Sequence, residues 1–183
     1  MISEQLIQRI KTKDRDAFKE LFDMYREKVY RMSYIILKDK TASEDVLQEV
    51  FIQVYLKIRD LKHIGAFEVW LYRITTNCCR KLINKENKIR IINVNENYDG
   101  YADIQDDEIN TPESIIVNQE LCTEVMNVIY ELPEYQRISL VLFYYNEMSI
   151  KEIANTMNCS EGTVKSRLFH GKNHLKDKVA KII

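Results

Sequence analysis

The side chains best suited to chemistry lie near the C-terminal end of the chain, where cations, hydroxyls and an aromatic ring recur at helical spacing. Lysine and arginine bind phosphates, and an apolar ring can meet the methyl group of thymine. Phe169 would face outward, opposite Val164 and Leu168, or else pack against Tyr144 or Tyr145. The segment predicts a DNA-binding helix, and its candidate residues are Ser160, Thr163, Lys165, Ser166, Arg167, Phe169, His170 and Lys172.

A second polar group lies opposite the apolar stripe of a helix predicted from residue 41 to about 58. It consists of Asp45, Gln48, Glu49 and Gln53. A solvated surface explains such a face as well as a binding partner does. Taken alone, the group indicates only a candidate surface for another protein.

A third group follows Trp70, on a helix predicted from residue 66 to about 84. Trp70 belongs to the apolar stripe of this helix. The other members are expected to face away from that stripe, and they are Tyr72, Arg73, Thr76, Asn77 and Arg80. Aromatic, amide and cationic side chains together suit single-stranded nucleic acid, although they also suit an ordinary surface.

Other chemistries find little support in the sequence. His170 and His174 have the i,i+4 spacing of a zinc pair, but no HExxH sequence or third ligand accompanies them. The chain also contains no nucleophile elbow, phosphate-binding loop or dinucleotide-binding fingerprint. We therefore expect no catalytic activity, no metal and no cofactor.

Cysteine usage and hydropathy predict a cytoplasmic protein. The four cysteines show no CxxC spacing, so reduced thiols are the simplest interpretation. No window of eighteen consecutive apolar residues predicts a membrane span, and the N-terminal segment becomes charged too soon for a secretory signal. We expect no direct insertion into a membrane.

Helices must position these candidate residues, and apolar spacing predicts helices almost throughout. Glycine (4) and proline (2) are scarce, which disfavours β-sandwiches and glycine-rich nucleotide folds. The first part of the chain would begin with a short helix capped by Ser3, followed by a long one from residue 15 to about 38. A capping box at residues 41–44 would start the third helix, and a break at 61–65 would precede the fourth.

Charge divides the chain into two blocks. Residues 1–90 carry a net charge of +6, whereas residues 91–115 contain seven acidic and no basic residues. The acidic stretch has no sustained apolar period, so we interpret it as a flexible linker. The sequence thus predicts an all-α protein with two small helical domains, at 1–90 and 112–183, joined by an acidic linker at 91–111.

The second domain has the pattern of a helix-turn-helix. Thr111 and Pro112 would start its first helix, and Pro133 would separate that helix from the next. A capping box at residues 149–152 would then start a short helix, followed by a turn and a longer basic helix that Ser160 caps. Gly171 weakens the last helix by roughly 1 kcal/mol relative to alanine, which indicates a close contact at this position.

Several segments together resemble one known family. DAFKELFDMYREKVYRMSYIIL, ASEDVLQEVFIQVYLKI and FEVWLYRITTN resemble conserved region 2 of the extracytoplasmic function (ECF) group of sigma-70 factors. LPEYQRISLVLFYYNEMSIKEIANTMNCSEGTVKSRL resembles region 4 of the same group. The resemblance covers nearly the whole chain in order, with an acidic linker between the two regions.

This resemblance implies a function and partners. Region 2 of such factors binds the clamp helices of the largest RNA polymerase subunit, through the face that here carries residues 45–53. It also opens the promoter -10 element, with a base captured in the loop that here contains His63 and Ile64 and on the following helix. Region 4 places its recognition helix, here residues 161 to about 175, in the -35 major groove. The implied partners are bacterial core RNA polymerase, promoter DNA and an anti-sigma factor.

The sequence departs from the family at several positions. An alanine and a basic residue commonly stand where this chain has Thr75 and Thr76, and an aspartate where it has Lys81. The recognition helix of the family usually has an arginine-rich run in place of residues 169–173. The alternative interpretation is a helix-turn-helix regulator that does not engage core polymerase, but such a regulator has no reason to carry residues 45–53 together with FEVWLYRITTN.

Overall fold

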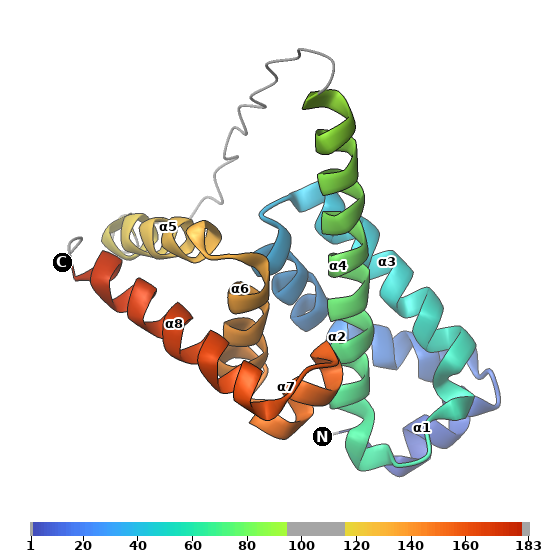
Figure 1. Ribbon diagram of the computed structural model, residues 1–183. Coiled ribbons are helices and arrows are strands. Elements are labelled where there is room, and N and C mark those ends of the chain that lie inside the picture. The colour runs from blue at the N-terminus through green and yellow to red at the C-terminus, as the bar shows by residue number, and fades with distance from the viewer. Residues whose placement is uncertain (1, 95–115, 181–183) are drawn as a thin grey trace.

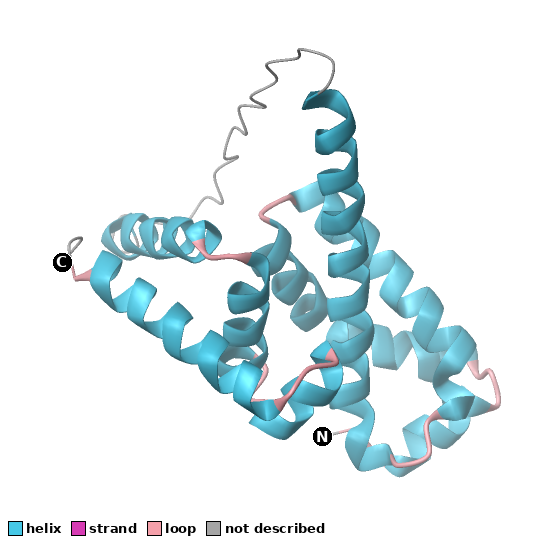
Figure 2. Cartoon of the chain, viewed as in Figure 1, coloured by secondary structure: helices cyan, strands magenta, loops and turns pink. Residues whose placement is uncertain are grey.

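The computed structural model describes residues 2–94 and 116–180 (Figure 1). Every regular element within these two ranges is helical, as the sequence predicts, and short loops join the helices (Figure 2). The first block contains α1 (Glu4–Lys11), α2 (Arg15–Leu37), α3 (Lys40–Lys57) and α4 (Phe67–Val94), with short 3₁₀ turns η1 (Ile58–Asp60) and η2 (Ile64–Ala66) between α3 and α4. The second block contains α5 (Ile116–Glu131), α6 (Glu134–Leu140), a π-helical turn η3 (Val141–Tyr145), α7 (Ile150–Met157) and α8 (Glu161–Val179).

Local capping explains where the helices of the first block begin. Ser3 caps α1 as predicted, because its Oγ accepts a hydrogen bond from the backbone N–H of Leu6 at 3.2 Å. The capping box predicted at residues 41–44 is wrong. Asp39 caps α3 instead, and its carboxylate accepts from the backbone N–H of Ala42 at 2.8 Å. Asparagine and aspartate stabilise a helix N-terminus better than threonine does, which favours the earlier start.

The helix that follows Trp70 is longer than the sequence predicts. α4 continues past Asn84 and ends at Val94. Residues 85–94 contain neither glycine nor proline, so no residue in this stretch interrupts the backbone hydrogen bonds.

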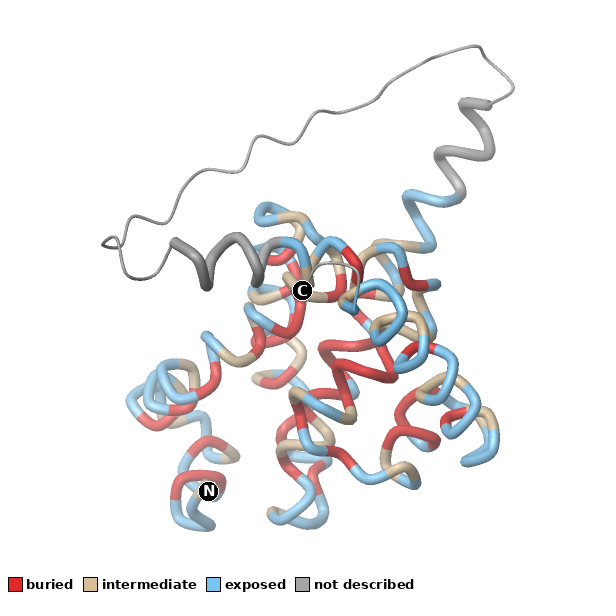
Figure 3. Tube along the Cα trace, turned by 90° about the vertical axis from the view of Figure 1, so that its left-hand side faces the viewer, coloured by how far each residue is buried: buried red, intermediate tan, exposed pale blue. Residues whose placement is uncertain are grey.

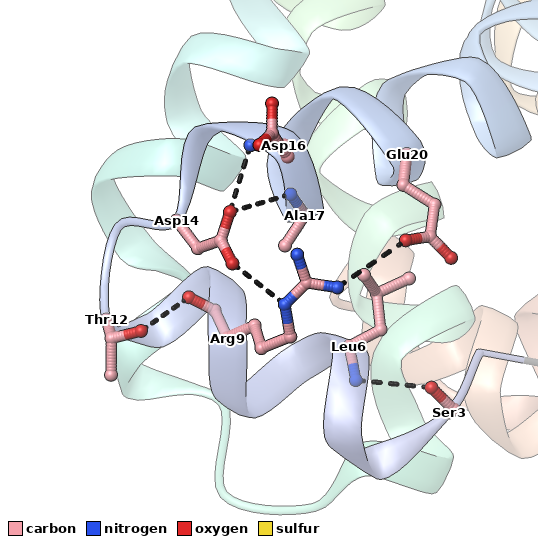
Figure 4. Close-up of polar contacts among 8 residues, drawn as sticks. All are labelled: Ser3, Leu6, Arg9, Thr12, Asp14, Asp16, Ala17 and Glu20. Atoms are coloured by element: carbon pink, nitrogen blue, oxygen red, sulfur yellow. Dashed lines mark hydrogen bonds and ion pairs between the residues drawn. The ribbon is translucent and has the colours of Figure 1, made fainter.

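Charged side chains fix the corner between α1 and α2 (Figure 4). One carboxylate oxygen of Asp14 accepts from the backbone N–H groups of Asp16 and Ala17, both at 3.0 Å. The other accepts from Nε of Arg9 at 2.8 Å. These hydrogen bonds hold the pKa of Asp14 below its usual value, with the largest effect from Ala17 and the next largest from Arg9. The corner directs α1 back against the bundle.

One apolar core orders α1 to α4. Its fully buried members include Ile7, Leu21, Val29, Ile36, Val50, Val54 and Leu71. Buried positions, drawn in red, recur along the helices in Figure 3. The rings of Phe22 and Phe51 meet edge to face, with their centroids 4.8 Å apart, and join α2 to α3. The Tyr25 hydroxyl donates to Oε1 of Glu68 at 2.9 Å and joins α2 to α4. These contacts leave one long side of α3 facing outward.

The second block forms the predicted helix-turn-helix. Ser149 and Glu152 form the predicted capping box at the start of α7, and Ser160 caps α8 by accepting from the backbone N–H of Thr163 at 3.1 Å. Gly171 is buried against α6, and a Cβ atom added there would lie 2.9 Å from Cδ1 of Leu140. The close contact predicted at Gly171 is therefore present. The predicted helix start at Thr111 and Pro112 lies outside the described residues.

The two blocks pack against each other along α2 and α4. α4 contacts α2 and α3, and also α7 of the second block. The Tyr130 hydroxyl donates to the carbonyl oxygen of Tyr34 at 2.9 Å, and Nζ of Lys38 donates to Oδ1 of Asn127 at 2.9 Å. Buried apolar residues of both blocks belong to one continuous cluster. The predicted domain boundaries stay a prediction, and most of the predicted linker lies outside the described residues.

Candidate nucleic-acid and protein interfaces

The exposed side of α8 carries most of the side chains predicted to contact duplex DNA. Exposed members are Ser160, Lys165, Ser166, Phe169, His170 and Lys172, and Thr163 is half-buried. The Phe169 side chain is 62% exposed, and its ring lies against His170 with centroids 5.5 Å apart. The ring thus faces outward, as the first of the two alternatives requires. An exposed aromatic ring is able to contact a base edge, and the lysines beside it are able to contact phosphates.

Arg167 faces a different direction from these residues. Its guanidinium lies 4.7 Å from the ring centroid of Tyr135 on α6, and Nη1 lies 3.5 Å from Sγ of Cys159. Both contacts are inside the second block, so Arg167 holds α8 against α6 in this structure. Its role in DNA binding stays a prediction.

Two residues of α4 do not face outward, contrary to the sequence interpretation. Tyr72 is 1% exposed and Thr76 is 0% exposed. Tyr72 lines a cavity of about 420 Å³ together with Tyr145 and Asn146 of the second block. The expectation is wrong because it gave α4 one buried side, whereas α2 and α3 cover one side and the second block covers another.

The remaining candidates on α4 and in the preceding loop are accessible to different degrees. Arg73 and Asn77 are exposed and lie one turn apart on the same face of α4. His63 is exposed and Ile64 is half-buried where η2 begins. Arg80 is half-buried, because its guanidinium lies 5.4 Å from the ring centroid of Tyr135.

Hydrogen bonds within α3 link part of its predicted polar face. Asp45, Gln48 and Glu49 are exposed, and Gln53 is half-buried. Nε2 of Gln53 donates to Oε1 of Glu49 at 2.8 Å, and Nζ of Lys57 donates to Oε1 of Gln53 at 3.1 Å. This chain of i,i+4 contacts holds the amide and carboxylate in fixed positions.

A groove of about 990 Å³ runs between α3 and α4 and brings two of the predicted groups together. Asp45, Glu49 and Gln53 line its α3 side. Asn77 and Lys81 line its α4 side. The groove therefore offers carboxylates on one wall and an amide and cations on the other.

Two apolar residues on the outward face of α3 are not among the predicted site residues. Ile52 is 54% exposed and Leu56 is 67% exposed. They continue the line of Asp45 and Glu49 at spacings of three and four residues. The sequence pattern that indicates them is an apolar i,i+4 pair outside the core stripe of α3. Together with the carboxylates they give α3 a surface that is polar at one end and apolar at the other.

His174, one of the two histidines of α8, takes part in a polar contact between α8 and α5. Nε2 of His174 lies 3.6 Å from Oε2 of Glu131 on α5, and Nζ of Lys178 lies 2.9 Å from the same oxygen. Lys178 and then His174 hold the pKa of Glu131 below its usual value. Within residues 2–94 and 116–180, no three His, Cys, Asp or Glu side chains are grouped so as to hold a metal ion.

Two family models of known proteins match this chain, one in each block. The family model for Sigma-70 region 2 matches residues 21–89, and that for Sigma-70, region 4 matches residues 122–175. The ECF RNA polymerase sigma factor SigW of Bacillus subtilis is 33% identical over 180 residues, which cover 96% of each chain. This chain belongs to the ECF RNA polymerase sigma factors. Its function is that of an alternative sigma factor, which directs transcription initiation.

A second relative agrees with this assignment over the full length of this chain. The ECF RNA polymerase sigma-E factor of Escherichia coli is 30% identical over 191 aligned positions, which cover 100% of this chain and 97% of the relative. The alternative of a regulator that does not engage polymerase leaves the region 2 match without an explanation.

Solved structures share the fold of this sigma factor at low sequence identity. The sigma factor RpoE of Bartonella quintana, in complex with the anti-sigma factor NepR, has a TM-score of 0.69 at 16% identity and covers 90% of this chain and 97% of its own. CnrH, in complex with the cytosolic domain of CnrY, has a TM-score of 0.66 at 19% identity and covers 94% of each chain. None of the helices among the described residues has the length and apolar character needed to span a membrane.

Proposed function

We propose that the outward face of α3 is the surface through which this sigma factor binds core RNA polymerase. The observation that carries this proposal is the combination of ordered polar residues and exposed apolar residues on one helix. Ile52 and Leu56 lose unfavourable contact with water when a partner covers them, whereas Asp45 and Glu49 pair with basic residues of that partner. Apolar anchors with a polar rim are typical of protein–protein interfaces.

The candidate single-strand surface comprises the loop around η2 and the exposed line of α4. His63 offers a ring for stacking, Asn77 offers an amide for a base edge, and Arg73 offers a cation for phosphate. These three side chains are exposed, which supports a role in binding the separated strands of the -10 element. In this proposal Asn77 stands at the edge of the groove beside α3, so polymerase and the -10 strand lie next to each other.

The candidate duplex surface is the exposed side of α8, and its target is the -35 element. The first turn of α8 directs backbone N–H groups at a phosphate, and Lys165 and Lys172 add cations. Phe169 and Ser166 are placed to contact base edges. Loss of a lysine would weaken binding to all sequences about equally, whereas loss of Phe169 would change the base preference.

The sigma factor acts without catalysing a reaction of its own, and it works in the cytoplasm beside RNA polymerase. An anti-sigma factor is its expected inhibitor. The complex of the sigma factor RpoE with the anti-sigma factor NepR supports this partner. CnrH, which has the same fold, is likewise bound to a second protein, the cytosolic domain of CnrY.

Charge reversal on α3 tests the polymerase surface. The double variant Asp45→Arg, Glu49→Arg should retain its helical circular dichroism and lose co-purification with bacterial core polymerase. The matched control is Asp23→Arg, Glu27→Arg, because these two acidic residues are also exposed and also one turn apart, but on α2. Exposed ion pairs contribute little to stability, so both variants should remain folded. Equal retention of core polymerase by both variants would contradict the assignment.

A further inference from the structure

Asn146, directly after η3, has a buried side-chain amide without hydrogen-bond partners. The residue is 7% exposed, and neither its Oδ1 nor its Nδ2 has a partner among the described residues. Its backbone N–H donates to the carbonyl oxygen of Val141 at 3.1 Å, which anchors the residue in place. The side chain lines the cavity of about 420 Å³ that also contains Tyr72. Because a buried amide without partners is costly, this one indicates a cavity suited to a molecule that supplies them.

One cation lines the same cavity. Lys28 of α2 is half-buried, and its Nζ lies 5.3 Å from the ring centroid of Tyr72. Burial lowers the pKa of Lys28, but the neighbouring Tyr72 and Glu68 outweigh this effect and raise it above its usual value. Lys28 is therefore charged at neutral pH. Among the described residues that line the cavity, it is the only cation.

Two carboxylates of the lining are held in place by hydrogen bonds. Oε1 of Glu68 on α4 accepts from the Tyr25 hydroxyl at 2.9 Å. Oε2 of Glu152 on α7 accepts from the backbone N–H and the hydroxyl of Ser149, at 2.8 and 2.7 Å. Each carboxylate thus keeps a second oxygen that is able to accept from a ligand. Glu147, which is exposed, adds a third negative charge to the lining.

The size and the remaining lining of the cavity suit a small ligand with an apolar part. A volume of about 420 Å³ lies within the range of roughly 300–1,000 Å³ that small-molecule sites occupy. Apolar surface comes from Ile64 and Val69 of the first block and from Met148 of the second. Few polar groups on a partly apolar wall are typical of sites that fix the orientation of one small molecule.

The balance of charges selects among ligand classes. A purely anionic ligand, such as a free phosphate, would meet one ammonium and three carboxylates and would be repelled. A purely cationic ligand would be repelled by Lys28 and would leave Nδ2 of Asn146 without an acceptor. A zwitterion with an apolar body satisfies both sets of groups.

We propose that this cavity binds a free α-amino acid with an apolar side chain. Lys28 and Nδ2 of Asn146 hold the α-carboxylate, and Glu68 and Glu152 hold the α-ammonium. The apolar side chain of the ligand lies against the apolar part of the wall. This inference goes beyond the polymerase and promoter surfaces and depends on neither assignment.

The test measures binding to the full-length chain by isothermal titration calorimetry at neutral pH. The probe is L-leucine. Leucinamide lacks the carboxylate, and 4-methylpentanoate lacks the ammonium, so each analogue tests one half of the site. Asn146→Leu replaces the amide with an apolar group of similar shape, and Lys28→Met removes the charge and keeps an unbranched side chain. The matched controls are Asn155→Leu and Lys151→Met, because both residues are exposed on α7 and do not line the cavity.

L-Leucine should bind saturably, with a Kd at or below about 1 mM for a ligand of this size. Leucinamide, 4-methylpentanoate and the two cavity variants should each weaken binding by about 10- to 100-fold, since each loses a charge-assisted or buried hydrogen bond. Asn155→Leu and Lys151→Met should match the wild type. Asn146→Leu should also raise the melting temperature of the ligand-free chain, because it removes a buried amide without partners.

Three results would overturn the inference. The first is an absence of saturable binding for leucine, isoleucine, valine, methionine and phenylalanine, which would leave the Asn146 amide to water. The second is wild-type affinity for leucine in Asn146→Leu or Lys28→Met. The third is binding of leucinamide or of free deoxynucleosides as tightly as leucine, which would assign the cavity to another ligand class.

Discussion

Gly171 offers a direct test of how α8 is seated on α6. Alanine is usually the better helix former, by about 1 kcal/mol, so Gly171→Ala would stabilise an isolated helix. In the structure, however, the added Cβ would lie 2.9 Å from Cδ1 and 3.3 Å from Cγ of Leu140. Carbon atoms in contact prefer separations of about 3.5–4.0 Å, so the two helices have to move apart by roughly half an ångström. Leu140 is only 6% exposed and has little room to change its rotamer.

The expected result is a net loss of stability. Overpacking of this kind costs about 1–3 kcal/mol, which exceeds the gain in helix propensity and leaves a loss of about 1 kcal/mol. For a chain of this size, 1 kcal/mol corresponds to a fall of about 2–4 °C in melting temperature. Differential scanning calorimetry measures this change.

Gly162 and Leu140 provide the controls for this prediction. Gly162 lies in the same helix, and an added Cβ would contact only Oγ of Ser160 at 3.7 Å. Gly162→Ala should therefore leave the melting temperature unchanged or raise it. In a Leu140→Ala background the clash is absent, so Gly171→Ala should no longer destabilise the protein. An increase in melting temperature for Gly171→Ala equal to that for Gly162→Ala would refute the reasoning.

Three further predictions concern the core, a helix cap and the exposed ring. Burial raises the pKa of the Cys78 thiol to about 11 and that of Cys79 to about 12, so the folded protein retains protons that the unfolded chain loses above pH 9. The free energy of unfolding in urea titrations should therefore fall as pH rises from about 9 to 12, by up to about 1.4 kcal/mol per pH unit for each thiol, and a double alanine variant should fall less steeply. Ser149→Ala removes the hydroxyl that accepts from the backbone N–H of Glu152 at 3.3 Å and should lower stability by about 0.5–2 kcal/mol in a thermal melt, while an unchanged melt would contradict the capping role. Phe169→Ala should leave the melting temperature nearly unchanged because the ring is 62% exposed, but should alter base preference in footprinting across varied -35 sequences; a large loss of stability would place the ring in the core.

Local chemistry made much of the fold predictable. The caps formed by Ser3, Ser149 and Ser160 depend only on neighbouring backbone groups, and all three were identified from sequence. Apolar spacing likewise predicted the four helices of the first block, since each helix carries an apolar stripe that packs into the core. The helix-turn-helix followed from the same two signals.

The parts that were not predicted depend on contacts between distant segments. Tyr72 is buried where the second block packs against α4, and periodicity within α4 contains no information about that partner. Arg167 has a cationic side chain of the kind that contacts DNA. However, its guanidinium packs on the ring of Tyr135, which lies 32 positions earlier in the chain, and this contact holds Arg167 within the second block. Ile52 and Leu56 lie outside the core stripe, and single apolar residues in such positions are also common on ordinary protein surfaces.

Transcription in vitro tests directly whether this chain directs initiation through both promoter elements. Bacterial core polymerase is incubated with a library of promoters randomised at -35 and -10, with and without this sigma factor, and the transcribed templates are sequenced. The sigma factor should select templates that share one -35 sequence and one -10 sequence. Asp45→Arg, Glu49→Arg should abolish this selection, whereas Asp23→Arg, Glu27→Arg should preserve it. Transcripts that do not differ from those of core polymerase alone would contradict the assigned function.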